Sequence, residues 1–315
     1  TQSRSSAASD VYKRQTSNNA LASATLLKAE FVSNSVTHYI YVRWTGSEGG
    51  IQSCAGPRTG SNAVTVNFYN ADVASGLQTG STNNAKVTDI AFSDTYQATS
   101  LYATKFNGVT YSTLLGYKSN TVTPGGDGLV GVNQFEFVTG SNCPASNISS
   151  VQARQLLTVG RIPVGQLTGD TNAHNRMGAY LVGRNSDSGT RLSVFGEVGY
   201  GANTKPIQYL VNSTNEIVQY PAETINGLAL TIGQSGYSSG GNVAGCFTNS
   251  ALYPLVSASL QVGNAAGVKS TTPFTNGAFI IGYAGVGDTR ANSAGAARAN
   301  CKPLTFNGVS NTSAN

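Results

Sequence analysis

The sequence predicts an α/β protein in which β-strands alternate with short helices. The chain has 315 residues, of which 39% are hydrophobic, so it is long enough to bury a large core. Some runs, such as THYIYVRWTG (37–46), alternate in polarity and are rich in Tyr, Ile and Val, which is typical of strands. Others, such as NISSVQARQLLTVGRI (147–162), place apolar residues at helical spacing. Because the two kinds of run alternate, we expect mixed, mostly parallel sheets.

The first part of the chain predicts a tail, one helix and several strands. Residues 1–18 are polar, with no strand pattern and no apolar segment of a signal peptide, and we expect a disordered or non-native tail. We expect a helix at 19–32, a strand at 37–46, and a turn leading into a short helix at 46–54. Further strand-like runs span 63–70, 86–94, 99–119 and 128–140.

The second part begins with the clearest helix, 147–162, which has Ser149 or Ser150 near its start as a cap. An apolar strand at 178–184 leads into the segment GRNSDSGTR (183–191), and a helix at 191–200 follows it. Strands are predicted at 227–233, 253–262 and 277–285.

The composition limits the function. Only 10% of residues are charged, the net charge is +5, and no basic run marks a nucleic-acid surface, so we expect no nucleic-acid partner. No stretch approaches the roughly 20 apolar residues of a membrane helix. Richness in Gly, with 37 residues, and in Ser, Thr and Asn is common outside the cytoplasm, and we expect a periplasmic or extracellular protein.

The four cysteines are widely separated along the chain, at Cys54, Cys143, Cys246 and Cys301. None belongs to a CxxC pair, which argues against a zinc site. We therefore expect one or two disulfides formed in an oxidising compartment, with all three pairings left open. Four buried free thiols are the alternative.

Polar residues follow three of the predicted strands. Ser47 follows the strand at 37–46, Asp94 ends the run at 86–94, and Arg184 with the segment 188–190 follows the strand at 178–184. A helix N-terminus offers unpaired N–H groups and partial positive charge, so small hydroxyl residues there suit a bound oxyanion. An arginine can bind two oxygens of such an anion at once. The pattern predicts an oxyanion site.

These segments resemble a known family. GRNSDSGTR, together with TGSEGG (45–50) and VTDIAFSD (87–94), is similar to the phosphate-binding component of phosphate ABC transporters. That family carries an R-x-x-x-S-G-T segment, a G-S-S-G-G turn and a strand ending in S-D. The helix at 147–162 and the strand GAFIIGYAG (277–285) also resemble family segments. The resemblance runs in order from about residue 37 to 290, and its S-G-T segment is the most specific part.

The resemblance implies a two-lobed periplasmic-binding-protein fold of type 2, with lobe 1 formed by 19–137 plus 279–315 and lobe 2 by 138–278. It implies a monomer that is not an enzyme, uses no cofactor or metal, captures phosphate between its lobes and delivers it to an ABC permease. Asp94 would accept the proton of a protonated phosphate and repel fully ionised sulfate. The ligand-binding residues that it implies are Ser47, Asp94, Arg184, Ser188, Gly189 and Thr190.

The chain departs from the family pattern at three places. Nothing in residues 1–36 matches the family's first strand and its anion loop, so this strand is missing or replaced by the polar tail. Glu48 occupies the place of the second Ser in the glycine turn. The family has an Asp two residues after the arginine, whereas here Ser186 stands in that place and Asp187 follows it.

Other functions remain open. GYSSG (236–240) matches a hydrolase nucleophile elbow at Ser238, but both histidines, His38 and His174, precede it, whereas the histidine of such hydrolases follows the serine. A metal site formed by Asp94, Glu48 and Asp187 is a minor alternative. The main alternative is a cell-surface structural or adhesive protein, which would explain the composition but not the polar residues at the strand ends. In a mixed form of this alternative, such a protein keeps the binding fold without transport.

Overall fold

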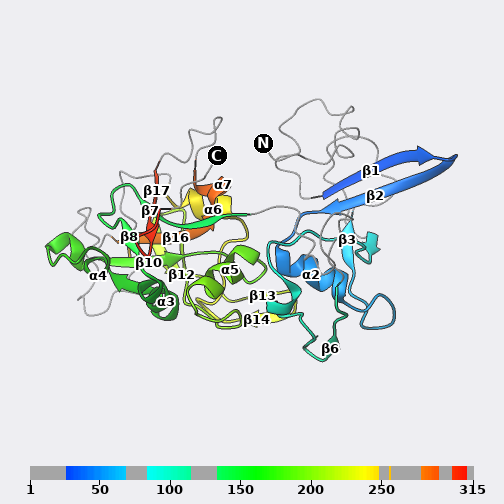
Figure 1. The fold of residues 1–315 in the computed structure, drawn as a ribbon, viewed down its shortest axis with the longest axis horizontal. Helices are drawn as coiled ribbons and strands as arrows, with labels where there is room; N and C mark the ends of the chain where they lie inside the picture. Colours follow the sequence, from blue (N-terminus) through cyan, green and yellow to red (C-terminus); the bar gives the residue numbers. More distant parts are fainter. Residues whose placement is uncertain are drawn as a thin grey trace.

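The structure is a computed structural model that describes residues 26–68, 84–114, 133–247, 255–256, 278–290 and 300–310. It is a mixed α/β protein with one five-stranded sheet and several small sheets. We call the described residues 26–114 the N-terminal section and the described residues 133–310 the sheet section. Figure 1 shows the five-stranded sheet on one side of the molecule and α2 with β1, β2 and β3 on the other.

The five-stranded sheet has the order β17-β7-β16-β10-β9. Only β10 and β16 run parallel, whereas β9, β7 and β17 each pair antiparallel with their neighbours. The expectation of mostly parallel pairing is therefore wrong for this sheet, because the alternation of strands and helices does not fix pairing direction. The bounds are β7 (Phe135–Gly140), β9 (Arg161–Pro163), β10 (Gly178–Val182), β16 (Phe279–Gly285) and β17 (Cys301–Pro303).

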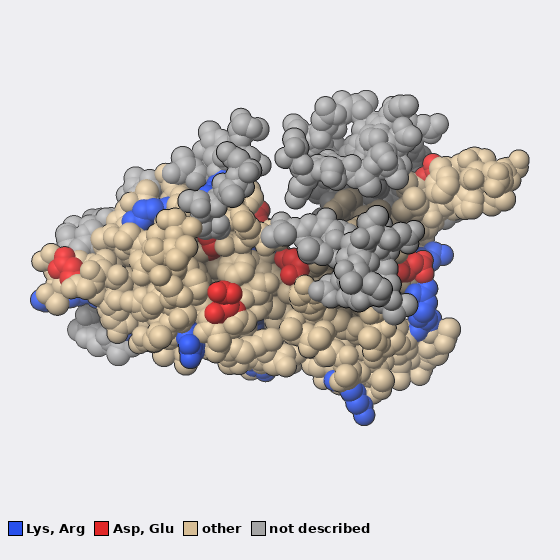
Figure 2. All heavy atoms as spheres, in the orientation of Figure 1, with Lys and Arg blue, Asp and Glu red and all other residues tan. Residues whose placement is uncertain are grey.

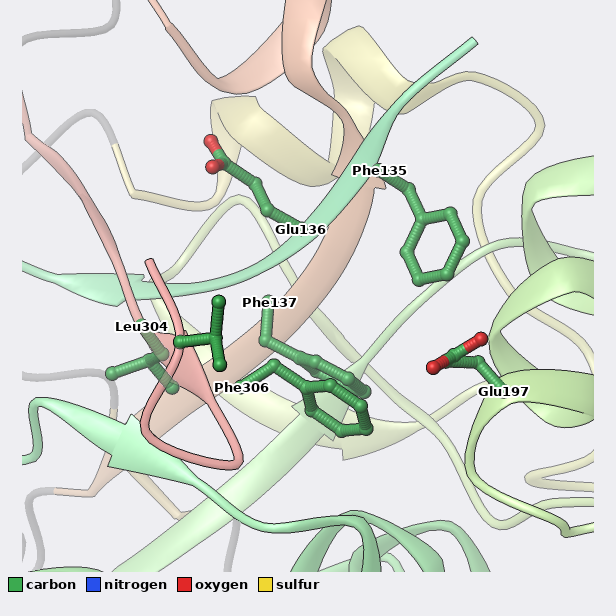
Figure 3. Close-up of a pocket in the computed structure, with 7 residues that line it drawn as sticks. Phe135, Glu136, Phe137, Glu197, Leu304 and Phe306 are labelled. Carbon is green, nitrogen blue, oxygen red and sulfur yellow. The ribbon is translucent and has the colours of Figure 1, made fainter. Parts of the chain in front are cut away.

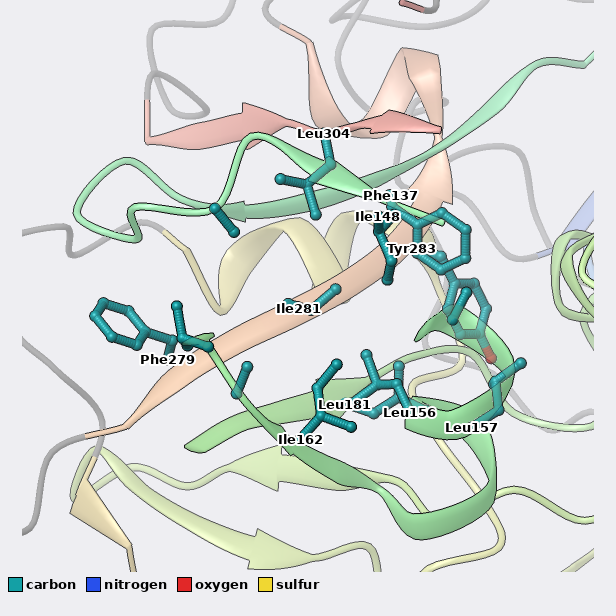
Figure 4. Close-up of a cluster of buried hydrophobic side chains, with 14 of the residues drawn as sticks. Phe137, Ile148, Leu156, Leu157, Ile162, Leu181, Phe279, Ile281, Tyr283 and Leu304 are labelled. Atoms are coloured by element: carbon teal, nitrogen blue, oxygen red, sulfur yellow. The ribbon is translucent and has the colours of Figure 1, made fainter. Parts of the chain in front are cut away.

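The sheet is buried on both faces. Along β16, Phe279, Ile281 and Tyr283 face one cluster, which also contains side chains of α3 (Ser150–Val159) and α5 (Gly189–Glu197). Ile280 belongs to the opposite cluster, with side chains of α6 (Gly240–Gly245). Figure 4 shows side chains of the first cluster gathered along β16. This two-sided burial explains why the strand at 277–285 is apolar at nearly every position.

The predicted helices at 147–162 and 191–200 are confirmed as α3 and α5. Ser149 and Gln152 form a capping box at the start of α3, and Gly160 ends that helix in the left-handed conformation with φ of 74°. The Ser188 side chain caps α5 by accepting a hydrogen bond from the Arg191 N–H. The predicted strands at 178–184 and 277–285 are confirmed as β10 and β16.

The N-terminal section has its own small core. Ile51 and Ala55 of α2 (Ser47–Ala55) pack with Tyr102 and Tyr111, and the predicted short helix at 46–54 is thereby confirmed. The predicted strands at 37–46 and 63–70 are confirmed in shorter form as β2 and β3. The strands are β1 (Leu26–Ser33), β2 (Val36–Arg43), β3 (Val66–Phe68), β4 (Asn84–Lys86), β5 (Lys105–Phe106) and β6 (Val109–Thr110).

Two predictions in this section are wrong. Residues 26–32 of the expected helix at 19–32 belong to β1, which forms a hairpin with β2 in which Phe31 stacks on His38 at 4.9 Å. Residues 1–25 lie outside the described residues. The run at 86–94 alternates in polarity but forms no strand beyond Lys86. Ile90 and Phe92 are 78% and 79% exposed and pack against no partner strand among the described residues.

Small sheets complete the sheet section. The predicted strands at 227–233 and 253–262 appear as the short β14 and β15, while residues 253–254 and 257–262 lie outside the described part. The bounds are β8 (Asn147–Ile148), β11 (Tyr209–Val211), β12 (Glu216–Gln219), β13 (Glu223–Ile225), β14 (Leu228–Leu230), β15 (Leu255–Val256) and β18 (Thr305–Phe306), with short helices α4 (Gly165–Thr168) and α7 (Val286–Thr289). The five-stranded sheet crosses the expected lobe boundary at 278–279, since β16 and β17 join β10 in it.

All four cysteines are free thiols, so the expectation of one or two disulfides is not met. Cys143 is buried, and the other three are half-buried. Among the described residues, none of the helices has the length and apolar character that crossing a membrane requires. Figure 2 shows that charged side chains are sparse on the face it displays, in keeping with the composition.

Candidate anion-binding site

The candidate site lies where β10 leads into α5, at the carboxyl ends of the parallel pair β10 and β16. Gly183 allows the backbone to pass close to Gln208 here, because a Cβ at this position would lie 2.1 Å from Oε1 of Gln208. Arg184 then pairs with Tyr237 in an isolated bridge, and the loop continues to Ser188, the cap of α5. This edge of a sheet is a usual location for ligands in α/β proteins.

Side chains from both sections meet at Asp94. The Ser47 hydroxyl donates to the Asp94 carboxylate, and the Asp94 N–H donates to Ser47 Oγ at 3.2 Å. Thr190 Oγ1 lies 3.4 Å from the same carboxylate. Asn133 Nδ2, on the chain just before β7, donates to it at 3.2 Å. Asp94 is therefore in direct contact with two other predicted residues, Ser47 and Thr190.

Gly189 completes this contact. A Cβ on Gly189 would lie 1.6 Å from Asp94 Oδ1 and 2.6 Å from Ser47 Oγ. Only a glycine therefore fits between the first turn of α5 and the Asp94 carboxylate. The partial positive charge of the α5 N-terminus faces this carboxylate, which stabilises it there.

Arg184 lies beside the Asp94 contact. Its guanidinium donates to the carbonyl oxygens of Tyr237 at 3.3 Å and Ser238 at 3.0 Å. Burial lowers the pKa of Arg184, while the nearby Asp288, Asp94 and Asp187 act in the opposite direction. Arginine stays protonated in proteins, so Arg184 contributes a positive charge.

Asp187 has a role that the sequence does not reveal. Its carboxylate accepts hydrogen bonds from the backbone N–H of Gly46 at 2.7 Å and of Gly49 at 2.5 Å, and from Asn226 Nδ2 at 2.7 Å. It thus occupies the N-terminus of α2. Burial raises the pKa of Asp187 above its ordinary value, although these hydrogen bonds and the Arg184 charge oppose the rise.

Ser188 is part of the loop but not of the Asp94 contact. Its hydroxyl accepts a hydrogen bond from the Arg191 N–H at 3.4 Å, which is the ordinary role of a helix cap. Its role as a ligand through its side chain stays a prediction.

Arg191 is a second cation beneath the loop. It is only 4% exposed, its Nη1 donates to the carbonyl oxygens of Arg184 at 3.2 Å and Gln234 at 3.0 Å, and its guanidinium lies 5.1 Å from the Phe195 ring centre. No carboxylate of a described residue lies within ion-pair distance of it. Burial lowers its pKa. The sequence signal was its place at the end of GRNSDSGTR, before an apolar run.

Glu48 is buried at the start of α2. Its Oε2 accepts from the Leu101 N–H at 3.0 Å, whereas its Oε1 has no hydrogen-bond partner among the described residues. Burial and the Asp187 charge raise the pKa of Glu48 to about 7, although the hydrogen bond from Leu101 opposes the rise. At neutral pH this residue therefore carries only part of the negative charge that the sequence suggests.

Two residues of the hydrolase alternative have the following contacts. The Ser238 carbonyl binds Arg184, and His38 stacks on Phe31 in the β1–β2 hairpin. In the part of the chain that the structure describes, no three His, Cys, Asp or Glu side chains are grouped to hold a metal ion.

Comparison of the chain with family models, with curated proteins and with solved structures found no match.

Proposed function

We propose that the protein is an extracytoplasmic binding protein that captures phosphate, or a closely similar oxyanion, between the N-terminal section and the sheet section. The two sections would form the two lobes of a periplasmic-binding-protein fold, and an ABC permease would receive the anion. The observation that carries the proposal is the contact of Ser47, Gly189 and Thr190 with Asp94, next to the charge of Arg184.

Positive charge beneath the loop supports an anion as the ligand. Arg184 is held by backbone carbonyls rather than by a bidentate carboxylate, and Arg191 is buried without a carboxylate partner in the described residues. A buried charge without a counter-ion is unfavourable, so a bound oxyanion near these guanidinium groups would stabilise both.

Asp94 supports phosphate rather than sulfate. At neutral pH phosphate retains at least one proton, which a carboxylate can accept, whereas sulfate has none to donate. The Asp94 carboxylate would therefore attract protonated phosphate and repel sulfate. The hydroxyls of Ser47 and Thr190, which bind Asp94 in this structure, would turn to donate to the anion oxygens.

Isothermal titration with phosphate, sulfate and arsenate tests the proposal. We expect heat on phosphate addition, weaker or absent heat with sulfate, and loss of phosphate binding in the Arg184→Ala variant. Arg176→Ala is the matched control, because Arg176 is exposed and binds only the Thr171 carbonyl in the described structure. No heat with any oxyanion, or equal losses in the two variants, would contradict the proposal.

A second candidate is a cell-surface structural or adhesive protein that keeps this fold without transport. One observation favours it, since Asp187 already binds the N–H groups at the start of α2 and Asp94 faces the start of α5. Internal carboxylates would then replace the bound anion permanently. The same titration separates the two candidates, because this one predicts no heat with phosphate.

A further inference from the structure

A cavity of about 200 Å³ lies away from the Asp94 contact, at the other end of α5. Five of its seven lining residues are apolar, and two are glutamates. The lining consists of Phe135, Glu136, Phe137, Glu197, Leu304, Phe306 and Val309. Figure 3 shows the Phe135, Phe137 and Phe306 rings on the side of the cavity that faces Glu197.

The aromatic rings are firmly placed. Phe137 is 3% exposed and stacks on Phe306, with ring centres 5.8 Å apart and planes 23° apart. Phe137 also meets Tyr283 edge to face at 6.3 Å. The rings therefore form a preformed apolar wall, and aromatic faces attract cations.

Of the two glutamates, only Glu197 offers its charge to the cavity. Glu136 is 4% exposed and is neutralised by Arg290, with Nη2 to Oε2 at 2.6 Å, and by the Thr289 hydroxyl. In Figure 3 its carboxylate points away from the Phe137 and Phe306 rings. Glu197 is exposed and forms no hydrogen bond or ion pair with any described residue.

The surroundings of Glu197 make this end of the cavity negative. Glu197 is the last residue of α5, where the helix carbonyls add partial negative charge. Arg154 donates to the Val198 carbonyl at 3.1 Å and offsets part of this charge, but no described Lys or Arg lines the cavity. An anion would be repelled here, and a neutral ligand would gain nothing from the carboxylate.

We propose that this cavity binds a quaternary ammonium compound, with its alkylated nitrogen between Glu197 and the rings of Phe135 and Phe306. A primary ammonium or a guanidinium carries several N–H donors, and a single carboxylate among carbon atoms would leave some of them unpaired. A quaternary nitrogen carries the positive charge without N–H donors, so it needs no hydrogen-bond acceptor. Aromatic faces and one carboxylate are enough to stabilise it.

Titration with choline and with its neutral isostere 3,3-dimethylbutan-1-ol tests this inference. We expect choline to bind at least tenfold more tightly than the alcohol, and ammonium chloride not to compete with it. Glu197→Gln should weaken choline binding about tenfold and leave the alcohol unchanged. Glu30→Gln removes the same charge from an exposed site on β1 and should change neither.

A Phe306→Leu variant provides the second arm, because Leu keeps apolar volume but removes the aromatic face. A melting curve checks that this variant folds, and its choline affinity should fall. Equal affinity for choline and the alcohol, no choline binding, or choline binding unaffected by Glu197→Gln would overturn the inference. These outcomes are independent of the phosphate titration, so the two proposals fail separately.

Discussion

The carboxylate of Asp187 accepts a hydrogen bond from the backbone N–H of Gly46 at 2.7 Å. Because Asp187 belongs to the loop before α5 and Gly46 is the cap of α2, this bond joins the beginnings of two helices from different sections. The Gly49 N–H donates to the same carboxylate at 2.5 Å. Close packing accompanies the bonds, since a Cβ on Gly46 would lie 2.0 Å from the Asp187 carbonyl oxygen.

Removal of the Asp187 carboxylate should weaken the contact between the N-terminal section and the sheet section, which we call the junction. Asp187→Ala leaves the N–H groups of Gly46 and Gly49 without their acceptor, and we expect the free energy of unfolding to fall by about 2 kcal/mol. Urea denaturation followed by circular dichroism measures this change. Asp170→Ala, at an exposed residue in the loop after α4, is the control, and an equal loss in both variants would show that the Asp187 bonds stabilise nothing specific.

Gly189→Ala should displace Asp94. The new Cβ would overlap the Asp94 carboxylate, so we expect phosphate affinity to fall at least tenfold, which is about 1.4 kcal/mol. Gly196→Ala, in the same helix, is the matched control, since its Cβ meets nothing within 4 Å. That variant should be stabilised by up to about 1 kcal/mol through helix propensity. Unchanged phosphate affinity in Gly189→Ala would place the anion elsewhere.

Glu48 should make stability depend on pH. Its pKa is raised from 4.5 to about 7 in the folded protein, so above pH 4.5 the unfolded chain loses a proton that the folded protein retains. Stability should therefore fall as pH rises from about 4.5 to 7 and then level off, by up to about 3 kcal/mol in total. Glu48→Gln should remove this slope, and Glu30→Gln should not. Thermal melts at pH 5, 6, 7 and 8 measure it; a slope of the same size in Glu48→Gln would rule out this cause.

The Asn226–Gly227 turn between β13 and β14 should hold the two sections together. Its Asn226 carbonyl accepts from Tyr102 Oη at 3.1 Å and from Gln52 Nε2 at 3.2 Å, and its side chain binds Asp187. Asn226→Gly keeps the positive φ of 50° but removes the side chain, so we expect a loss of about 1 kcal/mol.

Hydrogen exchange of the Gly49 amide measures the local effect of that change. Asn34→Gly, in the β1–β2 turn with φ of 49°, is the matched control. We expect faster Gly49 exchange in Asn226→Gly only. The same rate in both variants would show that the Asn226 side chain does not stabilise the junction.

The sequence was informative where local chemistry determines local structure. A serine near the start of an apolar run with helical spacing predicts α3, and the apolar run at 277–285 predicts β16. The sequence misled at 86–94, where alternating polarity is not matched by a partner strand among the described residues, and at 26–32, where cross-strand pairing prevails over helical spacing. Pairing direction depends on tertiary packing, which no local pattern contains.

The residues that meet at Asp94 were also predicted in part. Small and hydroxyl residues at helix starts indicated Ser47, Gly189 and Thr190, and the structure brings them to Asp94. Ser188 serves as a cap, which is the commoner use of a serine before a helix. The role of Asp187 could not be predicted, because its partners, Gly46 and Gly49, lie about 140 residues away in the chain.

Crystals soaked in arsenate would show whether an oxyanion binds beside Asp94, because arsenate has the shape and charge of phosphate and its arsenic can be located by anomalous scattering. We expect one strong peak within hydrogen-bonding reach of Ser47 Oγ, the Arg184 guanidinium and Thr190 Oγ1, with the Asp94 carboxylate facing it. A peak at another place, or an unchanged Ser47–Asp94 contact with no anion beside it, would refute phosphate capture at this site.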